Sequence, residues 1–210
     1  MGDPPGHPEP PGVLARRRAV RRRLTRSFLI LHGLEGSGPG HWQTWLAGRL
    51  RERGEDVRYP DLPDPLDPTP DEWLAALRPE LAALEGERIV LCHSLACLLW
   101  MLNARDGATG AAERVLLVAP PCIDDHEQVG RFRPDGVTAN DLERAARETL
   151  MFCGSPDPYC PGTALRAFGA LVPNAIGAPG AGHVNTDAGY GPWPAVEEWA
   201  RGERPDLVGN

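Results

Sequence analysis

Short apolar runs that alternate with amphipathic segments are the feature of this sequence that most constrains its fold. The apolar, strand-like runs are residues 27–31, 57–59, 88–92, 114–119, 149–153 and 174–177. The amphipathic, helix-like segments are residues 41–53, 71–84, 95–105, 162–171 and 193–201. Strands that alternate with helices along a chain build a mostly parallel sheet with helices on both faces. We therefore expect an α/β, three-layer fold around a central sheet of about five to six strands.

The chain is long enough for one domain and short for two, since it has 210 residues of which 41% are hydrophobic. We expect that domain to span residues 27–205. The N-terminal tail, residues 1–26, differs from it, because proline and glycine dominate up to Gly12 and seven arginines follow. The tail carries a charge of +5, which leaves −12 on the rest of the chain. We interpret the tail as a solvated, disordered extension; binding of its arginines to nucleic acid or anionic lipid is the alternative.

Neither a membrane span nor an export signal is expected. No stretch approaches the roughly 18 consecutive apolar residues of a spanning helix. The arginines of the tail precede only four apolar residues before His32 and Gly33 interrupt, whereas the apolar part of an export signal needs about 7 to 15. The five cysteines are odd in number and contain no Cys-x-x-Cys pair, which argues against a zinc site or a disulfide scaffold. We expect reduced thiols and a cytoplasmic protein.

The segment 88–97, Arg-Ile-Val-Leu-Cys-His-Ser-Leu-Ala-Cys, leads from a hydrophobic strand through Ser94 into an apolar helix. A nucleophile elbow has this form, in which a tight strand-to-helix turn lifts a serine hydroxyl above the edge of the sheet. The residues two before and two after the serine must be small, and here they are Cys92 and Ala96 instead of the usual glycines. We predict that Ser94 is a nucleophile; the alternative is a serine that only caps the helix.

A serine nucleophile requires a histidine base and a carboxylate, which follow the serine in the order acid, histidine in this type of site. Asp157 lies in the turn Gly-Ser-Pro-Asp-Pro directly after a strand-like run. His183 lies in a glycine-rich loop after the expected last strand. We predict Asp157 as the acid and His183 as the base. Asp124 and Asp125, which follow another expected strand, are the alternative acids.

The glycine-rich loop 31–38, Leu-His-Gly-Leu-Glu-Gly-Ser-Gly, suits an oxyanion hole because its glycines permit close backbone approach. Such a hole consists of two backbone amides that point at the oxygen on which negative charge develops. We predict the amides of Leu34 and Leu95 as these donors. The loop lacks both the Gly-x-Gly-x-x-Gly spacing and the Gly-Lys-Ser/Thr ending of nucleotide-binding loops, so nucleotide binding is not expected.

Residues next to these motifs are expected to contact the substrate. They are His32, Gly33 and His93, of which His93 is also expected to pack against the elbow or orient it. Residues 121–147 are polar and weakly patterned, and we expect them to cover part of the site and to influence selectivity. His126 belongs to this segment and could approach the substrate.

Five motifs, taken together, match the pattern of a known family. They are Leu-Ile-Leu-His-Gly at 29–33 with His-Trp at 41–42, Cys-His-Ser-Leu-Ala at 92–96, Gly-Ser-Pro-Asp at 154–157, Ala-Gly-His-Val-Asn at 181–185 and Gly-Tyr-Gly-Pro-Trp-Pro at 189–194. Over about residues 27–201 the chain resembles the small serine hydrolases related to retinoblastoma-binding protein nine. The resemblance implies a compact α/β-hydrolase fold without a large cap domain, a triad of Ser94, Asp157 and His183, and no cofactor.

The sequence therefore predicts a serine hydrolase that cleaves a small ester, thioester or amide, with a small-molecule acyl compound as substrate and no metal. A non-catalytic binding protein that retains the fold and an acyltransferase are the alternatives, since fold alone does not separate them. The complete set of serine, acid and histidine favours the enzyme. No specific nucleic-acid partner is expected, and the sequence gives no indication of an oligomeric state.

Overall fold

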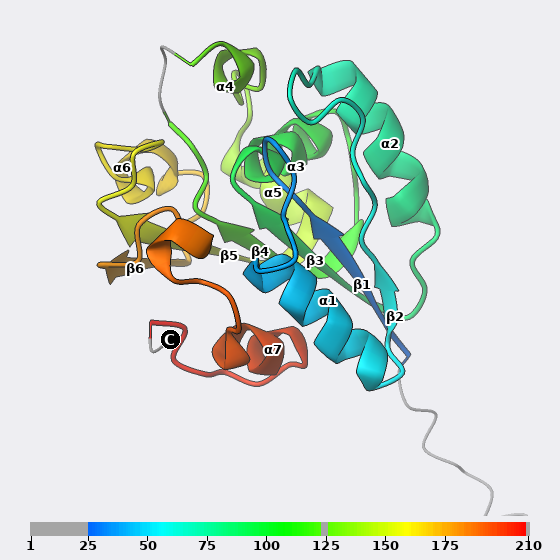
Figure 1. Cartoon of the computed structure of the whole chain (residues 1–210). Helices are drawn as coiled ribbons and strands as arrows, with labels where there is room; N and C mark the ends of the chain where they lie inside the picture. Colours follow the sequence, from blue (N-terminus) through cyan, green and yellow to red (C-terminus); the bar gives the residue numbers. More distant parts are fainter. Residues whose placement is uncertain (1–24, 123–125, 209–210) are drawn as a thin grey trace, which may run out of the picture.

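The computed structural model describes residues 25–122 and 126–208, and its centre is a parallel sheet (Figure 1). The strands are β1 (Arg26–Leu31), β2 (Asp56–Arg58), β3 (Glu87–His93), β4 (Ala112–Val118), β5 (Ala146–Ser155) and β6 (Ala175–Pro179). They are ordered β2-β1-β3-β4-β5-β6, and every neighbouring pair is parallel. The expected parallel sheet is confirmed. Because all strands run the same way, the segments that follow them gather at one edge of the sheet.

Helices cover both faces of the sheet. They are α1 (Trp42–Glu52), α2 (Pro70–Ala82), α3 (Leu95–Arg105), α4 (Glu127–Arg131), α5 (Ala139–Ala145), α6 (Ala164–Phe168) and α7 (Pro194–Ala200), with a short 3₁₀ helix, η2 (Thr186–Ala188). One core cluster holds the buried side chains of α1 and α7, and a second holds those of α2, α3 and α5. The fold is therefore three-layered, as expected, and no large cap domain occurs in the described part of the chain (Figure 1).

Local sequence explains where α1 and α2, which lie on opposite faces of the sheet, begin. Thr69 caps α2 by accepting a hydrogen bond from the Glu72 amide, and Pro70 takes the first helical position, where a proline loses no hydrogen bond. At α1 the cap is His41, whose ring accepts from the Gln43 amide. Trp42, the first residue of α1, is fully buried.

The structure contains two helices, α4 and α5, within the segment 121–147, whose sequence is polar and weakly patterned. Helix α5 begins with a capping box, in which the side chain of Thr138 and that of Asp141 each accept from the other residue's amide. Leu142 is buried between this helix and the core. A helix of seven residues has room for only about two turns, too few for a recognisable apolar period.

A disulfide joins Cys122 to Cys160. It contradicts the expected set of reduced thiols, on which the expected cytoplasmic location rested. The two residues are 38 positions apart, and the pairing depends on β4 and β5 ending side by side, which spacing alone does not reveal. The other three cysteines, Cys92, Cys97 and Cys153, are buried thiols.

The first strand begins at Arg26, the last residue of the expected tail, and residues 1–24 of that tail lie outside the described residues. Among residues 25–122 and 126–208, no helix is both long and apolar enough to cross a membrane.

Candidate active site

Ser94 occupies the tight turn between β3 and α3 in a backbone conformation that residues other than glycine rarely adopt. Its φ is 54° and its ψ is −123°. Its amide donates to the carbonyl of Val118 on the neighbouring strand, with a distance of 2.9 Å between nitrogen and oxygen. This hydrogen bond holds the turn in place. The side chain makes no capping hydrogen bond to α3, so the alternative role of a helix cap is wrong. Cys92 and Ala96 are fully buried, so small side chains suffice where glycines are usual.

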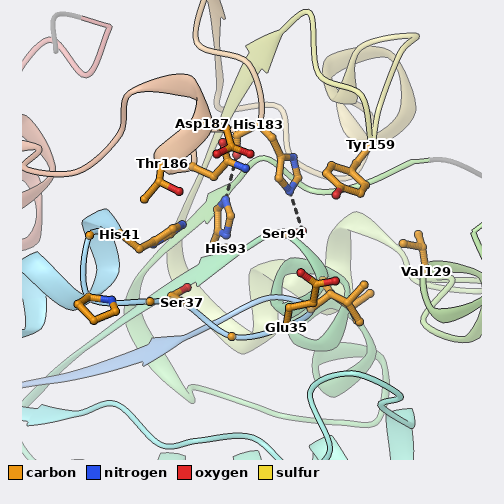
Figure 2. A pocket seen from close by; sticks show the side chains of 17 residues that line it. Glu35, Ser37, His41, His93, Ser94, Val129, Tyr159, His183, Thr186 and Asp187 are labelled. Atoms are coloured by element: carbon orange, nitrogen blue, oxygen red, sulfur yellow. Dashed lines mark hydrogen bonds between the residues drawn. The ribbon is translucent and has the colours of Figure 1, made fainter.

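The structure brings Ser94, Asp157 and His183 into one hydrogen-bonded chain. His183 Nε2 lies 2.9 Å from Ser94 Oγ (Figure 2), and His183 Nδ1 lies 2.8 Å from Asp157 Oδ2. The three residues follow β3, β5 and β6, whose carboxyl ends share one edge of the sheet. With Nδ1–H donating to the carboxylate, the lone pair of Nε2 faces the serine hydroxyl. This arrangement can remove the proton of a nucleophilic serine.

Neighbouring groups hold the histidine and the aspartate in place. The amide of Tyr159 donates to Asp157 Oδ1 at 2.8 Å, and the Tyr159 ring lies 4.4 Å from the His183 ring, centroid to centroid. His93 Nε2–H donates to the carbonyl of His183 at 3.0 Å. His93 thus holds the backbone of the base in place, whereas it was expected to pack against the elbow or orient it. Tyr159 was not predicted, although its position two residues after Asp157 is a signal that sequence reasoning could have used.

The loop after β1 passes directly over the elbow. A methyl group placed on Gly33 would lie 2.7 Å from Ser94 Cβ and 3.2 Å from Ser94 Oγ, so only glycine permits this approach. The amides of Leu34 and Leu95, the two expected oxyanion donors, have no hydrogen-bond partner among the described residues. Both residues line the pocket in front of Ser94.

His32 has a structural position rather than a place in the pocket. Its Nε2 accepts from the Leu62 amide at 2.9 Å, and its Nδ1 donates to the Gly33 carbonyl at 2.8 Å. Both ring nitrogens are therefore used by the backbone. Neither His32 nor Gly33, both expected at the substrate, is among the residues that line the pocket.

The pocket has a volume of about 510 Å³ and opens onto Ser94 (Figure 2). Of the expected site residues, it is lined by Leu34, His93, Ser94, Leu95 and His183. Asp157 is not in its lining. Sequence reasoning missed other residues of the lining, among them Glu35, His41, Val129, Tyr159 and Asp187. The structure places Val129, from α4, in this wall, within the segment 121–147 that was expected to cover the site.

Two histidines that line the pocket, His41 and His93, are shifted towards their neutral forms. Burial, together with the nearby His183, lowers the pKa of His41 to about 4. Burial also lowers the pKa of His93 well below its usual value. Removing a group from water disfavours its charged form, which is the sign of both shifts. Near neutral pH neither ring brings a positive charge to the pocket.

Three further expectations concern the alternative acids, His126 and a metal site. Asp124 and Asp125, the alternative acids, lie outside the described residues. His126 lies 6.3 Å from the Tyr159 ring and is not in the pocket lining. Residues 25–122 and 126–208 contain no group of three or more histidine, cysteine, aspartate or glutamate side chains that could hold a metal ion.

Comparison with known proteins gives one family and several similar structures. The model of the family described as "Serine hydrolase" matches residues 28–201. The YdeN protein of Bacillus subtilis (strain 168) is 32% identical over 74 residues, an alignment that covers 35% of this chain and 39% of the relative. Its crystal structure superimposes with a TM-score of 0.74 at 20% identity, over 84% of this chain and 97% of that chain.

Two further structures share the fold at low identity. A YdeN-like protein from Pectobacterium atrosepticum gives a TM-score of 0.64 at 23% identity, over 84% of this chain and 91% of its own. Est1E from Butyrivibrio proteoclasticus gives 0.60 at 17% identity, over 86% and 88%. These likenesses establish an α/β-hydrolase fold. The family match spans nearly the whole described domain, and we conclude that the chain belongs to the serine hydrolase family.

Proposed function

We propose that this protein hydrolyses a small ester, thioester or amide through an acyl-enzyme on Ser94. The observation that carries the proposal is the continuous chain of hydrogen bonds from Ser94 Oγ through His183 to Asp157, at 2.9 and 2.8 Å. It opens onto the pocket, where a substrate carbonyl can approach the serine. Membership of the serine hydrolase family supports the same chemistry.

In the first half of the proposed reaction, Ser94 Oγ attacks the substrate carbonyl carbon while His183 Nε2 takes the hydroxyl proton. The carbonyl π electrons move to the oxygen, which becomes an oxyanion. When the tetrahedral intermediate collapses, the bond to the leaving group breaks and His183 returns the proton to that group. Asp157 keeps Nδ1 of His183 protonated and stabilises the imidazolium. The acyl group then remains on Ser94.

In the second half, water replaces the leaving group. His183 removes a proton from water, the hydroxide attacks the acyl carbon, and the bond to Ser94 Oγ breaks as His183 returns the proton to the serine. The amides of Leu34 and Leu95, which have no partner among residues 25–122 and 126–208, donate to the oxyanion in both halves of the proposed reaction. One such donor contributes on the order of 3 kcal/mol to transition-state stabilisation.

The size of the pocket supports a small acyl substrate. Its volume of about 510 Å³ is within the usual range of small-molecule sites. Val129 and Tyr159 form apolar parts of its wall, and they suit an acyl chain or ring. Three expectations from the sequence stay predictions. They are membership of the group around retinoblastoma-binding protein nine, the absence of a cofactor and a cytoplasmic location.

A fluorophosphonate probe tests the proposal, because it phosphonylates only an activated serine. We expect labelling of the wild-type protein at Ser94, mapped by mass spectrometry, and none in Ser94→Ala. A panel of p-nitrophenyl esters of increasing chain length then measures turnover. The absence of labelling in protein with a normal thermal unfolding transition would refute the hydrolase and favour a binding protein.

Acyl transfer is distinguished by the acceptor. If water is the acceptor, the free acid should remain the main product when small alcohols or amines are added to the ester assay. Transfer of most of the acyl group to the added nucleophile at low concentration would favour an acyltransferase instead.

A further inference from the structure

The pocket beside Ser94 carries two acidic side chains, Glu35 and Asp187. Both are exposed, and neither forms an ion pair with any residue of the described chain. No arginine lines the pocket, and the chain contains no lysine. Within the described part of the chain, the acidic side chains therefore face the pocket without a compensating cation in its lining.

His41 contributes a polar ring to the same wall. His41 is only 5% exposed, and its Nδ1 accepts from the Gln43 amide at 3.2 Å. In the neutral ring the proton is then on Nε2, which has no hydrogen-bond partner among the described residues. Figure 2 shows the ring directed from the start of α1 towards His93, 4.8 Å away between centroids. His41 thus adds an uncharged donor to the pocket that contains the two carboxylates.

The histidines do not offset the two carboxylates. Burial lowers the pKa of His41 to about 4 and that of His93 well below its usual value, so both rings are uncharged near neutral pH. The described residues add negative potential, since their 16 arginines and 25 acidic side chains give a formal charge of −9. The field in the pocket is therefore negative.

Asp187 lines the same pocket as His183 and follows it by four residues, on η2. His183 is the residue that would protonate the leaving group, so a leaving group in transit passes near Asp187.

We infer that the site prefers substrates whose leaving group carries an ammonium cation and discriminates against those whose leaving group carries a carboxylate. The inference rests on the proposed function, and it specifies the substrate class. Because both carboxylates are exposed, we expect a preference of about tenfold rather than a very large one. Added salt should reduce it by screening.

Three thioesters of similar shape test the inference: acetylthiocholine, the dimethylbutyl thioacetate in which carbon replaces the nitrogen, and S-acetylmercaptobutyrate. Each releases a thiol that one colour reagent detects. We expect kcat/KM to fall in the order cationic, neutral, anionic. The ratio of the cationic to the neutral substrate should fall towards one in the Glu35→Gln, Asp187→Asn double variant.

Matched variants control for net charge. Glu143 and Asp71 are exposed acidic residues on α5 and α2 that form no ion pair in the described chain and do not line the pocket. The Glu143→Gln, Asp71→Asn double variant has the same net charge as the pocket variant. It should keep the wild-type ratio. An equal fall in both double variants, equal rates for all three thioesters, or a faster anionic substrate would overturn the inference.

A binding measurement separates this inference from the proposed hydrolysis. Titration calorimetry of acetylthiocholine into Ser94→Ala protein does not depend on turnover. Binding that the pocket variant weakens about tenfold, in protein that hydrolyses no thioester, would support the inference while the hydrolase proposal fails. Hydrolysis of all three thioesters without discrimination, and without charge-dependent binding, would overturn the inference and leave the hydrolase proposal standing.

Discussion

The substitution Gly33→Ala tests the close contact between the loop after β1 and the nucleophile. The added Cβ would lie 2.7 Å from Ser94 Cβ and 3.2 Å from the carbonyl of His93. Carbon atoms prefer a separation of about 3.5 to 4.0 Å, so the loop and the elbow must move apart by about 1 Å. Such a movement displaces the Leu34 amide from the oxyanion.

The effect on activity should be much larger than the effect on stability. Misplacing a catalytic group by about 1 Å costs about 100-fold in rate, and losing an oxyanion donor costs about 100- to 1000-fold. We therefore expect kcat/KM for a p-nitrophenyl ester to fall about 100-fold or more. Overpacking of this kind costs about 1 to 3 kcal/mol of stability, which leaves a protein of ordinary stability folded at room temperature.

The assay compares kcat/KM with the thermal unfolding midpoint in the same preparations. Gly48→Ala is the matched control, because nothing lies within 4 Å of the Cβ it adds on α1. It should leave kcat/KM unchanged within about twofold, since helices tolerate alanine well. Gly33→Ala protein that remains folded and keeps more than a third of wild-type activity would refute the argument that this contact positions the oxyanion donor.

Three other predictions follow from the site and its supports. Asp157→Asn should lower kcat by about 1000- to 10,000-fold with little change in KM, because the amide no longer holds Nδ1 of His183 protonated; ester kinetics check this, and a loss below tenfold would contradict it. Reduction of the Cys122–Cys160 bond should lower the free energy of unfolding by about 2 to 4 kcal/mol. Adding reductant should therefore lower the unfolding midpoint of the wild-type protein and leave that of the Cys122→Ser, Cys160→Ser variant unchanged. The pKa of His41 is about 4 in the folded protein, below its usual value of 6.5. Between these pH values the folded state binds fewer protons than the unfolded state, so the free energy of unfolding should fall as the pH drops from 6.5 to 4. Urea unfolding should show a smaller loss over that window in His41→Asn, and an unchanged loss would contradict the assignment.

Much of the fold and the order of the site residues could be predicted because both depend on local pattern. The apolar run 88–92 and the helix after it carry their period in the sequence, and Ser94 sits where one pattern changes to the other. Parallel strands bring their carboxyl ends to one edge, so Asp157 and His183, each placed after a strand, were expected near Ser94. The distances that join them were not available from any of these patterns.

Tertiary structure alone decided the features that depend on which loops meet. The Cys122–Cys160 bond, which the cysteine count argued against, forms because β4 and β5 are neighbours. His32, expected at the substrate, instead bonds the backbone of the loop containing Leu62, and a sequence pattern does not show the direction of a side chain. Helices of five and seven residues are stabilised by their packing, so α4 and α5 had no readable period.

The composition of the pocket shows the same division. The sequence by itself determined an acidic domain, a serine at a strand-to-helix turn, and an acid and a histidine in order. Only the folded chain decided that Glu35 and Asp187, from segments about 150 residues apart, would face one cavity with the buried ring of His41. Local periodicity is set by neighbouring residues, whereas the charge and shape of a cavity are set by residues that become neighbours only when the sheet is complete.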